Sequence, residues 1–220
     1  MQRIPLSLRL KRESHRRIAQ AQDLIVREVM KHAEEAVMHG GTAIWRCYDG
    51  KRFSEDVNYY LERNLDRINA IFLSLQDAGF SIVKKKITGR GIFSELVLDR
   101  TAVRFEATFQ KKKGILADYE TADGNFVTIH ALSPESFIRE KVDAYLHRKK
   151  IRDLWDVFFL LKSVRDVAAV KKDVERLLQS CSPPVDESDL KAIIIEGITP
   201  SSKEMLEYIR TWESKSIRKG

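Results

Sequence analysis

The sequence has few cysteines, glycines and prolines, and it lacks a long apolar run. Only 2 of its 220 residues are cysteine. Cys47 and Cys181 have neither metal-ligand spacing nor the number needed for a disulfide framework, so a reducing cytoplasm is the expected location. The 10 glycines and 5 prolines exclude a collagen-like or low-complexity chain. The longest apolar run, residues 157–161, is far too short to span a bilayer, and no secretory signal follows the basic N-terminus. We therefore expect no membrane attachment.

Basic residues outnumber acidic ones and are clustered along the chain. The 39 Lys and Arg residues against 32 Asp and Glu residues give a formal net charge of +7. Residues 1–20 are basic, and three short blocks follow at 84–86, 111–113 and 148–150. Such clusters attract polyanions such as nucleic acid or nucleotides, although a solvated basic surface has the same composition. The charge pattern favours a partner that carries phosphate.

Apolar periodicity predicts an α+β region followed by a helical region. Helical spacing covers residues 13–33 and 65–75. Strands are expected at 36–39, 55–61, 80–88, 92–98, 102–110 and 126–130, from period-two alternation or short apolar runs between turn residues. Ser133 followed by Pro134 is typical of a helix start. The expected domains are a mixed sheet flanked by helices over 1–131 and a helical C-terminal region over 132–220.

Three side chains on two of these strands could present oxygen atoms to one cation. Asp56 and Asn58, two residues apart on a strand, point to the same side, and Glu106 lies on the polar face of another strand. If the two strands are neighbours, the three side chains converge beside the Gly40-Gly41 turn, whose backbone N–H groups could approach a phosphate. Mg²⁺ prefers such oxygen ligands, so the set indicates phosphoryl or nucleotidyl transfer. Ordinary solvent-exposed strand faces and a plain turn remain the alternative.

A carboxylate also interrupts the apolar run at residues 154–161. Asp156 is costly in such surroundings unless it has a partner, and Lys141, Arg152 or a substrate cleft could serve. Asp153 lies three residues earlier and therefore on the same helical face. The alternative to a functional role is a buried ion pair that joins two helices.

Three stretches and one strand residue resemble a known family. Residues 40–43 read Gly-Gly-Thr-Ala, residues 52–58 read Arg-Phe-Ser-Glu-Asp-Val-Asn, and Glu140-Lys141-Val142 precedes Arg-Asp-Leu-Trp-Asp at 152–156. These resemble the "GGTAL", "RFSEDID" and "EKL … RDLYDL" motifs of the AbiEii/AbiGii nucleotidyltransferase toxin family, in the DNA polymerase β-like nucleotidyltransferase superfamily. Glu106 resembles the third acidic position of that superfamily. The resemblance covers residues 36–162 and implies a nucleotidyltransferase-like mixed sheet.

The resemblance also implies a role for each matching residue near the glycine turn. The residues that would hold the triphosphate of an NTP are Gly40, Gly41, Thr42 and Ser54. Asp56, Asn58 and Glu106 would bind Mg²⁺ or Mn²⁺. Glu106 would in addition orient or deprotonate the attacking hydroxyl.

The helical segment would complete the catalytic set. By resemblance, Lys141 would contact a phosphate, and Asp153 or Asp156 would close the site from the helical side. Asn58 departs from the family, whose motif has aspartate at this metal position. Asparagine still offers a carbonyl oxygen but removes one negative charge, so we expect weaker Mg²⁺ binding, slower catalysis, or binding without turnover.

The function implied by the resemblance is transfer of a nucleoside monophosphate from an NTP to an acceptor hydroxyl. The acceptor would be an RNA 3′ end, such as that of tRNA, or a protein. The protein would be the toxin of a toxin–antitoxin or phage-defence pair, with a cognate antitoxin as partner. One alternative is a catalytically weakened module that binds nucleotide or RNA on the same fold. Another is a structural or interaction protein on a retired catalytic fold, in which Glu106 or Asp156 would be locked in salt bridges away from the cleft.

Overall fold

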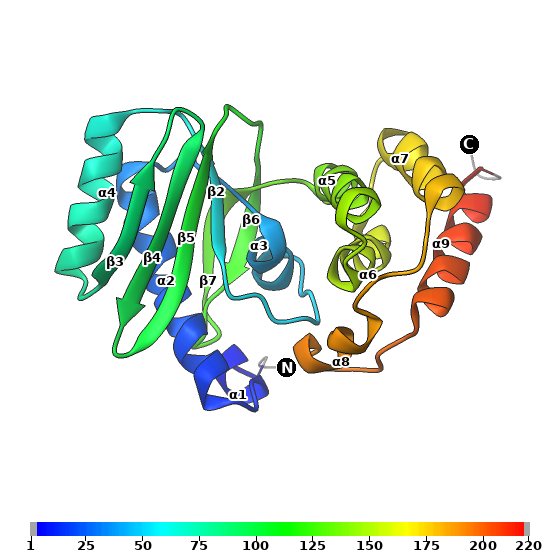
Figure 1. Ribbon diagram of the computed structural model, residues 1–220, viewed down its shortest axis with the longest axis horizontal. Coiled ribbons are helices and arrows are strands. Elements are labelled where there is room, and N and C mark those ends of the chain that lie inside the picture. Colours follow the sequence, from blue (N-terminus) through cyan, green and yellow to red (C-terminus); the bar gives the residue numbers. More distant parts are fainter. Residues whose placement is uncertain (1–3, 218–220) are drawn as a thin grey trace. The chain divides into compact units, whose positions relative to one another are not determined.

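The computed structural model describes residues 4–217, and the chain forms two compact units (Figure 1). The first unit contains the chain up to Asp49 together with Phe53–Leu132. The second unit contains Gly50–Arg52 and the chain from Ser133 onward. A three-residue excursion therefore carries one part of the Arg-Phe-Ser-Glu-Asp stretch into the second unit.

Backbone contacts explain why this excursion belongs to the second unit. Arg52 forms an isolated antiparallel bridge with Ile194. The Ile195 N–H donates a hydrogen bond to the Lys51 carbonyl oxygen at 2.8 Å, and the Lys51 ammonium lies 3.3 Å from Glu196. Both the backbone and a side chain of the excursion are thus held by residues near 194–196.

The first unit is built around a seven-stranded mixed sheet. Its elements are α1 (Leu6–Arg9), α2 (Glu13–His32), β1 (Val37–His39), α3 (Gly40–Cys47), β2 (Val57–Leu61), α4 (Leu65–Asp77), β3 (Ser81–Ile87), β4 (Gly91–Leu98), β5 (Thr101–Phe109), β6 (Ile115–Glu120) and β7 (Phe126–Ala131). The strands are ordered β3-β4-β5-β2-β1-β7-β6. β2 is parallel to β5 and β1 is parallel to β7, whereas the other neighbouring pairs are antiparallel. The mixed sheet predicted from the sequence is confirmed.

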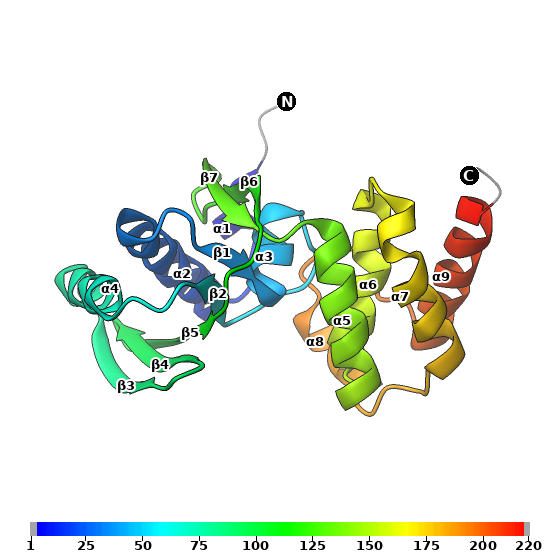
Figure 2. The same cartoon turned by 90° about the horizontal axis from the view of Figure 1, so that it is seen from above.

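The sheet has one apolar face covered by helices and one polar face. Along β5, Val103, Phe105 and Ala107 are buried and alternate with exposed or half-buried side chains. The Phe72 ring of α4 lies 5.9 Å from the Phe105 ring, and α2 and α4 lie on the same side of the sheet (Figure 2). Burial of this alternating apolar set drives the sheet and helices together. The other face of β4 and β5 carries the polar side chains.

The sequence prediction missed one strand of the first unit. β6 is an edge strand that pairs only with β7 among the described strands. Ile115 and Leu116 are adjacent and both exposed, so the segment lacks the alternation that identifies a half-buried strand. The strand expected at 55–61 begins at Val57, which places Asp56 just before β2.

The second unit is helical, as predicted. Its elements are α5 (Pro134–Arg148), α6 (Ile151–Leu160), η1 (Leu161–Ser163), α7 (Val167–Ser180), η2 (Glu187–Asp189), α8 (Leu190–Ile193) and α9 (Ser202–Ile217). α5 begins as expected, because Pro134 is at its start and the Ser133 hydroxyl accepts a hydrogen bond from the Ser136 N–H at 3.3 Å. None of the helices in residues 4–217 combines the length and apolarity required to cross a membrane.

Candidate functional site

Strand pairing brings Asn58 and Glu106 together on the polar face of the sheet. Asn58 of β2 is directly opposite Glu106 of β5, and His39 of β1 is opposite Asn58 on the other side. Asp56 lies just before β2, and its carboxylate reaches the same face, because it accepts hydrogen bonds from Arg104, two residues before Glu106 on β5. β2 and β5 are therefore neighbours, which is the arrangement that an oxygen-ligand set at these residues requires.

The glycine turn lies directly beside Asn58. Gly40 has φ +77°, and a Cβ atom at this position would lie 2.9 Å from Asn58 Nδ2. α3 begins at Gly40, so the N–H groups of Gly40, Gly41 and Thr42 belong to its first turn and have no partner within the helix. The missing side chain at Gly40 thus leaves room for the Asn58 amide beside a helix start.

We expect Gly40→Ala to lower the free energy of unfolding by about 1–2 kcal/mol or more, because an L side chain is strained at positive φ. The new methyl group must in addition displace the Asn58 amide. Urea unfolding of the variant measures the loss. Gly89→Ala is the matched control, since an added Cβ there meets no atom within 4 Å and its effect should stay within about 0.5 kcal/mol. Equal losses in both variants would contradict this explanation.

Buried polar contacts connect the glycine turn to the chain before β2. The Thr42 hydroxyl donates a hydrogen bond to the Asp56 carbonyl oxygen at 2.5 Å. The Gln22 side chain of α2 donates to the Ser54 carbonyl oxygen at 2.9 Å. Thr42 and Gln22 are both fully buried. These bonds fix the path of residues 54–56 and hence the position of Asp56 relative to α3.

Asp56 and Glu106 differ in their electrostatic surroundings. Arg104 donates two hydrogen bonds to the Asp56 carboxylate, at 2.7 and 3.0 Å. The Glu106 carboxylate forms no hydrogen bond or ion pair with any described side chain. Burial raises the pKa of Glu106, the negative charge of Asp56 raises it further, and Arg104 opposes both. Glu106 is therefore a half-buried carboxylate without a direct partner on the polar face.

The donor set at this place fits a hard divalent cation. In the described part of the chain, no three His, Cys, Asp or Glu side chains gather as a metal site. Asp56, Asn58 and Glu106 instead combine two carboxylates with an amide oxygen. Mg²⁺ commonly uses one or two protein carboxylates and completes its shell with waters and substrate phosphates. Two carboxylates and one amide match that requirement.

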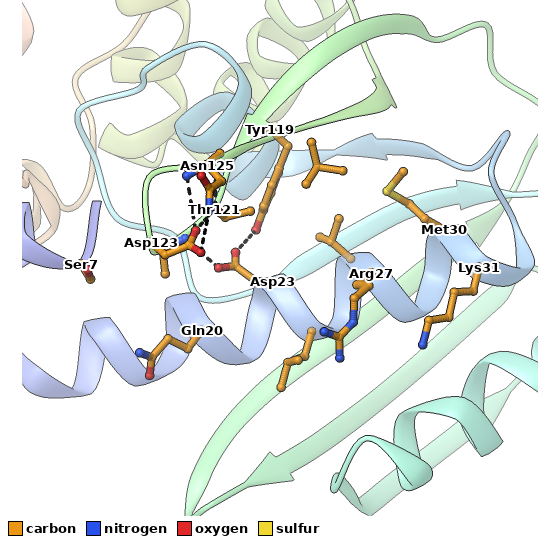
Figure 3. Close-up of a pocket in the computed structure, with 14 residues that line it drawn as sticks. Ser7, Gln20, Asp23, Arg27, Met30, Lys31, Tyr119, Thr121, Asp123 and Asn125 are labelled. Carbon is orange, nitrogen blue, oxygen red and sulfur yellow. Dashed lines mark hydrogen bonds between the residues drawn. The ribbon is translucent and has the colours of Figure 1, made fainter. Parts of the chain in front are cut away.

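A cavity of about 820 Å³ in the first unit lies between α2 and the β6–β7 hairpin (Figure 3). Asp23 points into this region, where it accepts hydrogen bonds from the Tyr119 hydroxyl at 3.0 Å and the Ala122 N–H at 2.7 Å. Arg46 donates a further hydrogen bond to Asp23. Burial is the main cause that raises the pKa of Asp23. Because these partners occupy the carboxylate, Asp23 joins α2 to the hairpin, and none of the predicted site residues lines the cavity.

The second unit holds Asp156 in a buried ion cluster. Asp156 is fully buried and accepts hydrogen bonds from Arg52 Nε at 2.6 Å and Nη2 at 2.7 Å. Lys141 Nζ lies 2.7 Å from its second oxygen. Burial alone would raise the pKa of Asp156, but the charges of Arg52 and Lys141 outweigh it and lower this pKa. Asp156 is thus ionised and doubly paired at neutral pH.

Asp153 belongs to the same cluster. Arg148 donates to both of its oxygens, at 2.7 and 2.8 Å, and Lys141 Nζ lies 3.4 Å from Oδ1. With Arg52 and Asp156, the cluster brings three cations, Arg52, Lys141 and Arg148, around two buried carboxylates. Asp156 is therefore held in salt bridges within the second unit, whereas Glu106 in the first unit forms none with a described side chain.

The predicted site residues fall into two groups. Those in the first unit are Gly40, Gly41, Thr42, Ser54, Asp56, Asn58 and Glu106, and those in the second unit are Lys141, Asp153 and Asp156. Sequence reasoning missed Arg104 and Arg52. Alternation along the strand could have indicated Arg104, two residues from Glu106 on the same face. For Arg52 the sequence offered only a weaker indication of a role, namely its position in the motif at residues 52–58.

A sequence profile of the family described as "Nucleotidyl transferase AbiEii toxin, Type IV TA system" matches residues 24–208. The chain belongs to this family. The resemblance carried by the glycine and Arg-Phe-Ser-Glu-Asp motifs is thereby confirmed. A search of curated proteins finds no match.

Solved structures support the same fold for this AbiEii family member. JHP933 from Helicobacter pylori is 17% identical, with a TM-score of 0.62 over 91% of this chain and 94% of that chain. A second H. pylori protein, provisionally assigned as a nucleotidyltransferase, is 17% identical, with a TM-score of 0.61 over 90% of this chain and 96% of that chain. At such identities the likeness concerns the fold, and it confirms the nucleotidyltransferase-like α+β architecture with a helical C-terminal region.

Proposed function

We propose that the protein transfers a nucleoside monophosphate from an NTP to an acceptor hydroxyl with the help of a divalent metal ion. The observation that carries this proposal is the pairing of Asn58 with Glu106 beside the Gly40 turn, in a chain of a nucleotidyltransferase family. Carboxylates next to backbone N–H groups at a helix start suit a metal-bound triphosphate.

In the first unit, separate residues would bind the metal ion, hold the triphosphate and accept the proton. Asp56, Asn58 and Glu106 would hold Mg²⁺ or Mn²⁺, which neutralises phosphate charge when bound. Gly40 and Gly41, with Thr42 and Ser54, would hold the triphosphate. The acceptor hydroxyl gives its proton to Glu106 while its oxygen forms a bond to the α-phosphorus. The bond from that phosphorus to the bridging oxygen breaks, and pyrophosphate leaves with the electron pair.

In the second unit, Lys141 is the proposed phosphate contact. Its ammonium lies 3.4 Å from an Asp153 oxygen and 2.7 Å from an Asp156 oxygen, and these two carboxylates fix its position. A cation held in a fixed position suits an anionic phosphate. Asp153 and Asp156 would act in this proposal by positioning Lys141.

The family description, which names a toxin of a Type IV toxin–antitoxin system, supports a proposal for the biological role. We propose that the chain is such a toxin, that a cognate antitoxin is its partner, and that the acceptor is tRNA, another RNA or a protein. We place this activity in the cytoplasm, where NTPs and these acceptors are available.

Incubation with each α-labelled NTP, Mg²⁺ or Mn²⁺, and either total RNA or cell protein tests the proposal. Label is expected in RNA or in a protein band, together with release of pyrophosphate. If no label transfers to either acceptor, and the Asn58→Asp variant is equally silent, the enzyme proposal fails.

Asn58 favours a second candidate, a module that binds nucleotide or RNA without turnover. The amide removes one negative charge from the place where the cation would lie, so metal affinity is lower. In that case NTP binding survives Asp56→Ala, and Mg²⁺ hardly strengthens it. Calorimetric titration of NTP with and without Mg²⁺ distinguishes the two candidates.

We expect Asn58→Asp to raise the rate of transfer at limiting Mg²⁺ by about tenfold, equivalent to ~1.4 kcal/mol. The added charge strengthens binding of the cation, while the side chain keeps its size beside Gly40. The measurement is the Mg²⁺ dependence of the initial rate. Asn69→Asp, an exposed residue of α4, adds the same charge elsewhere and should leave the Mg²⁺ dependence unchanged. A rate that falls in Asn58→Asp would show that the amide itself is required.

A further inference from the structure

A row of side chains crosses the polar face of the sheet, one from each of five adjacent strands. Strand register places them opposite one another in the order Lys86, Phe93, Glu106, Asn58 and His39. Neighbouring strands are about 4.8 Å apart, so Phe93 is one strand from Glu106 and Lys86 is two strands away. The row therefore leads from the β3 edge of the sheet to the glycine turn.

Phe93 is the unusual member of this row. Its side chain is 52% exposed on β4, on the face opposite to the one that packs against α2 and α4. By contrast, the Phe105 side chain of the neighbouring strand is fully buried on the apolar face of the sheet. Exposed aromatic rings on an open strand face are where the bases of single-stranded nucleic acids stack.

Several cations surround Phe93, and Lys86 is the one that could contact a phosphate without giving up a carboxylate partner. Lys84 and Lys86 share its face by alternation along β3, whereas Lys85 is directed to the opposite face, 4.1 Å above the Phe72 ring. Lys84 is 75% exposed and lies 2.9 Å from Glu95 of β4, and Arg104 of β5 is 58% exposed and paired with Asp56. Lys86, directly opposite Phe93, forms no ion pair with any described side chain. A strand face that combines an exposed ring with cations and leads to a carboxylate favours nucleic acid over a protein segment.

We propose that Lys84, Lys86 and Phe93, here called the β3–β4 platform, bind the 3′ end of a single-stranded nucleic acid. The terminal base stacks on Phe93, the preceding phosphates lie at the two lysines, and the 3′ hydroxyl reaches Glu106 on the next strand. The inference rests on the proposed function and narrows its acceptor to a nucleic acid.

Binding of a fluorescent single-stranded RNA of about 10 nucleotides to the full chain, without NTP, tests the platform by anisotropy. Phe93→Ala should raise the Kd about tenfold or more, because one stacked base is lost. Phe93→Tyr, which keeps the ring, should restore binding. Phe126→Ala is the matched control, since Phe126 on β7 is also 52% exposed, and it should leave the Kd unchanged.

The role of the lysines is tested by comparing Lys86→Ala with the control Lys85→Ala, because the Lys85 side chain is directed to the other face. Lys86→Ala should weaken RNA binding and lower the slope of log Kd against log salt concentration by about 1, because one phosphate contact is lost. Lys85→Ala should preserve that slope. A single-stranded DNA of the same sequence shows whether the 2′ hydroxyl is read.

The outcomes separate this inference from the proposed function. Equal Kd values for Phe93→Ala and Phe126→Ala would overturn the platform, as would transfer to a protein acceptor that Phe93→Ala leaves unchanged. RNA binding that depends on Phe93 in a protein without transfer activity would support the platform and count against the enzyme proposal.

Discussion

Glu106→Gln is expected to lower the rate of nucleotidyl transfer by about 10²- to 10⁴-fold, the usual contribution of a general base. Glutamine keeps the size and an oxygen atom of the side chain, but it cannot accept the proton of the attacking hydroxyl. Single-turnover transfer from a labelled NTP at saturating Mg²⁺ measures the loss. Glu62→Gln, an exposed carboxylate paired with Lys111, is the control and should keep the full rate.

The stability of the Glu106→Gln variant should stay the same or rise. Because burial and Asp56 raise the pKa of Glu106 in the folded protein, its ionised form is disfavoured there near neutral pH. Glutamine removes this cost, so urea unfolding without divalent ions should show an equal or larger free energy of unfolding. A rate loss with a stability loss would instead indicate a damaged fold, and a rate within threefold of the original would exclude Glu106 as the base.

Much of the first unit could be predicted from the sequence because its strands carry local signals. The alternation through Asp56 and Asn58, and that around Glu106, identified two strands and the face on which the polar side chains lie. Which strands are neighbours is a long-range property, so the opposition of Asn58 and Glu106 could only be stated as a condition. The contact between Gly40 and Asn58 depends on the same pairing.

The second unit shows the limit of sequence reasoning more clearly. The apolar run around Asp156 predicts that its carboxylate has a partner, and Lys141 is one of them. Arg52 could not be predicted, because it is 104 residues away and belongs to an excursion of the chain. The motif at residues 52–58 indicated a strand and a metal ligand, whereas Arg52 itself forms a buried ion pair with Asp156 of α6. One motif therefore serves both units.

We expect Arg52→Ala to lower the free energy of unfolding by about 3–5 kcal/mol, because it leaves a buried carboxylate with half of its compensation. The Arg52 side chain is 5% exposed and that of Asp156 is fully buried. Urea unfolding, with hydrogen exchange of α6 amides to locate the change, provides the measurement. Arg176→Ala is the control, since its ion pair with Asp143 is exposed and should be worth less than about 1 kcal/mol.

The pH dependence shows whether charge is the cause of this loss. In the natural protein the pKa of Asp156 is lowered, so its ionised form stabilises the fold at neutral pH, and this contribution is lost as pH falls through the lowered pKa. Without Arg52, burial shifts this pKa upward, and the penalty disappears once the carboxyl group is protonated. The difference in unfolding free energy between the two proteins should therefore be largest near neutral pH and shrink toward acid pH. A difference that does not change with pH would assign the loss to the packing of the arginine methylene groups instead.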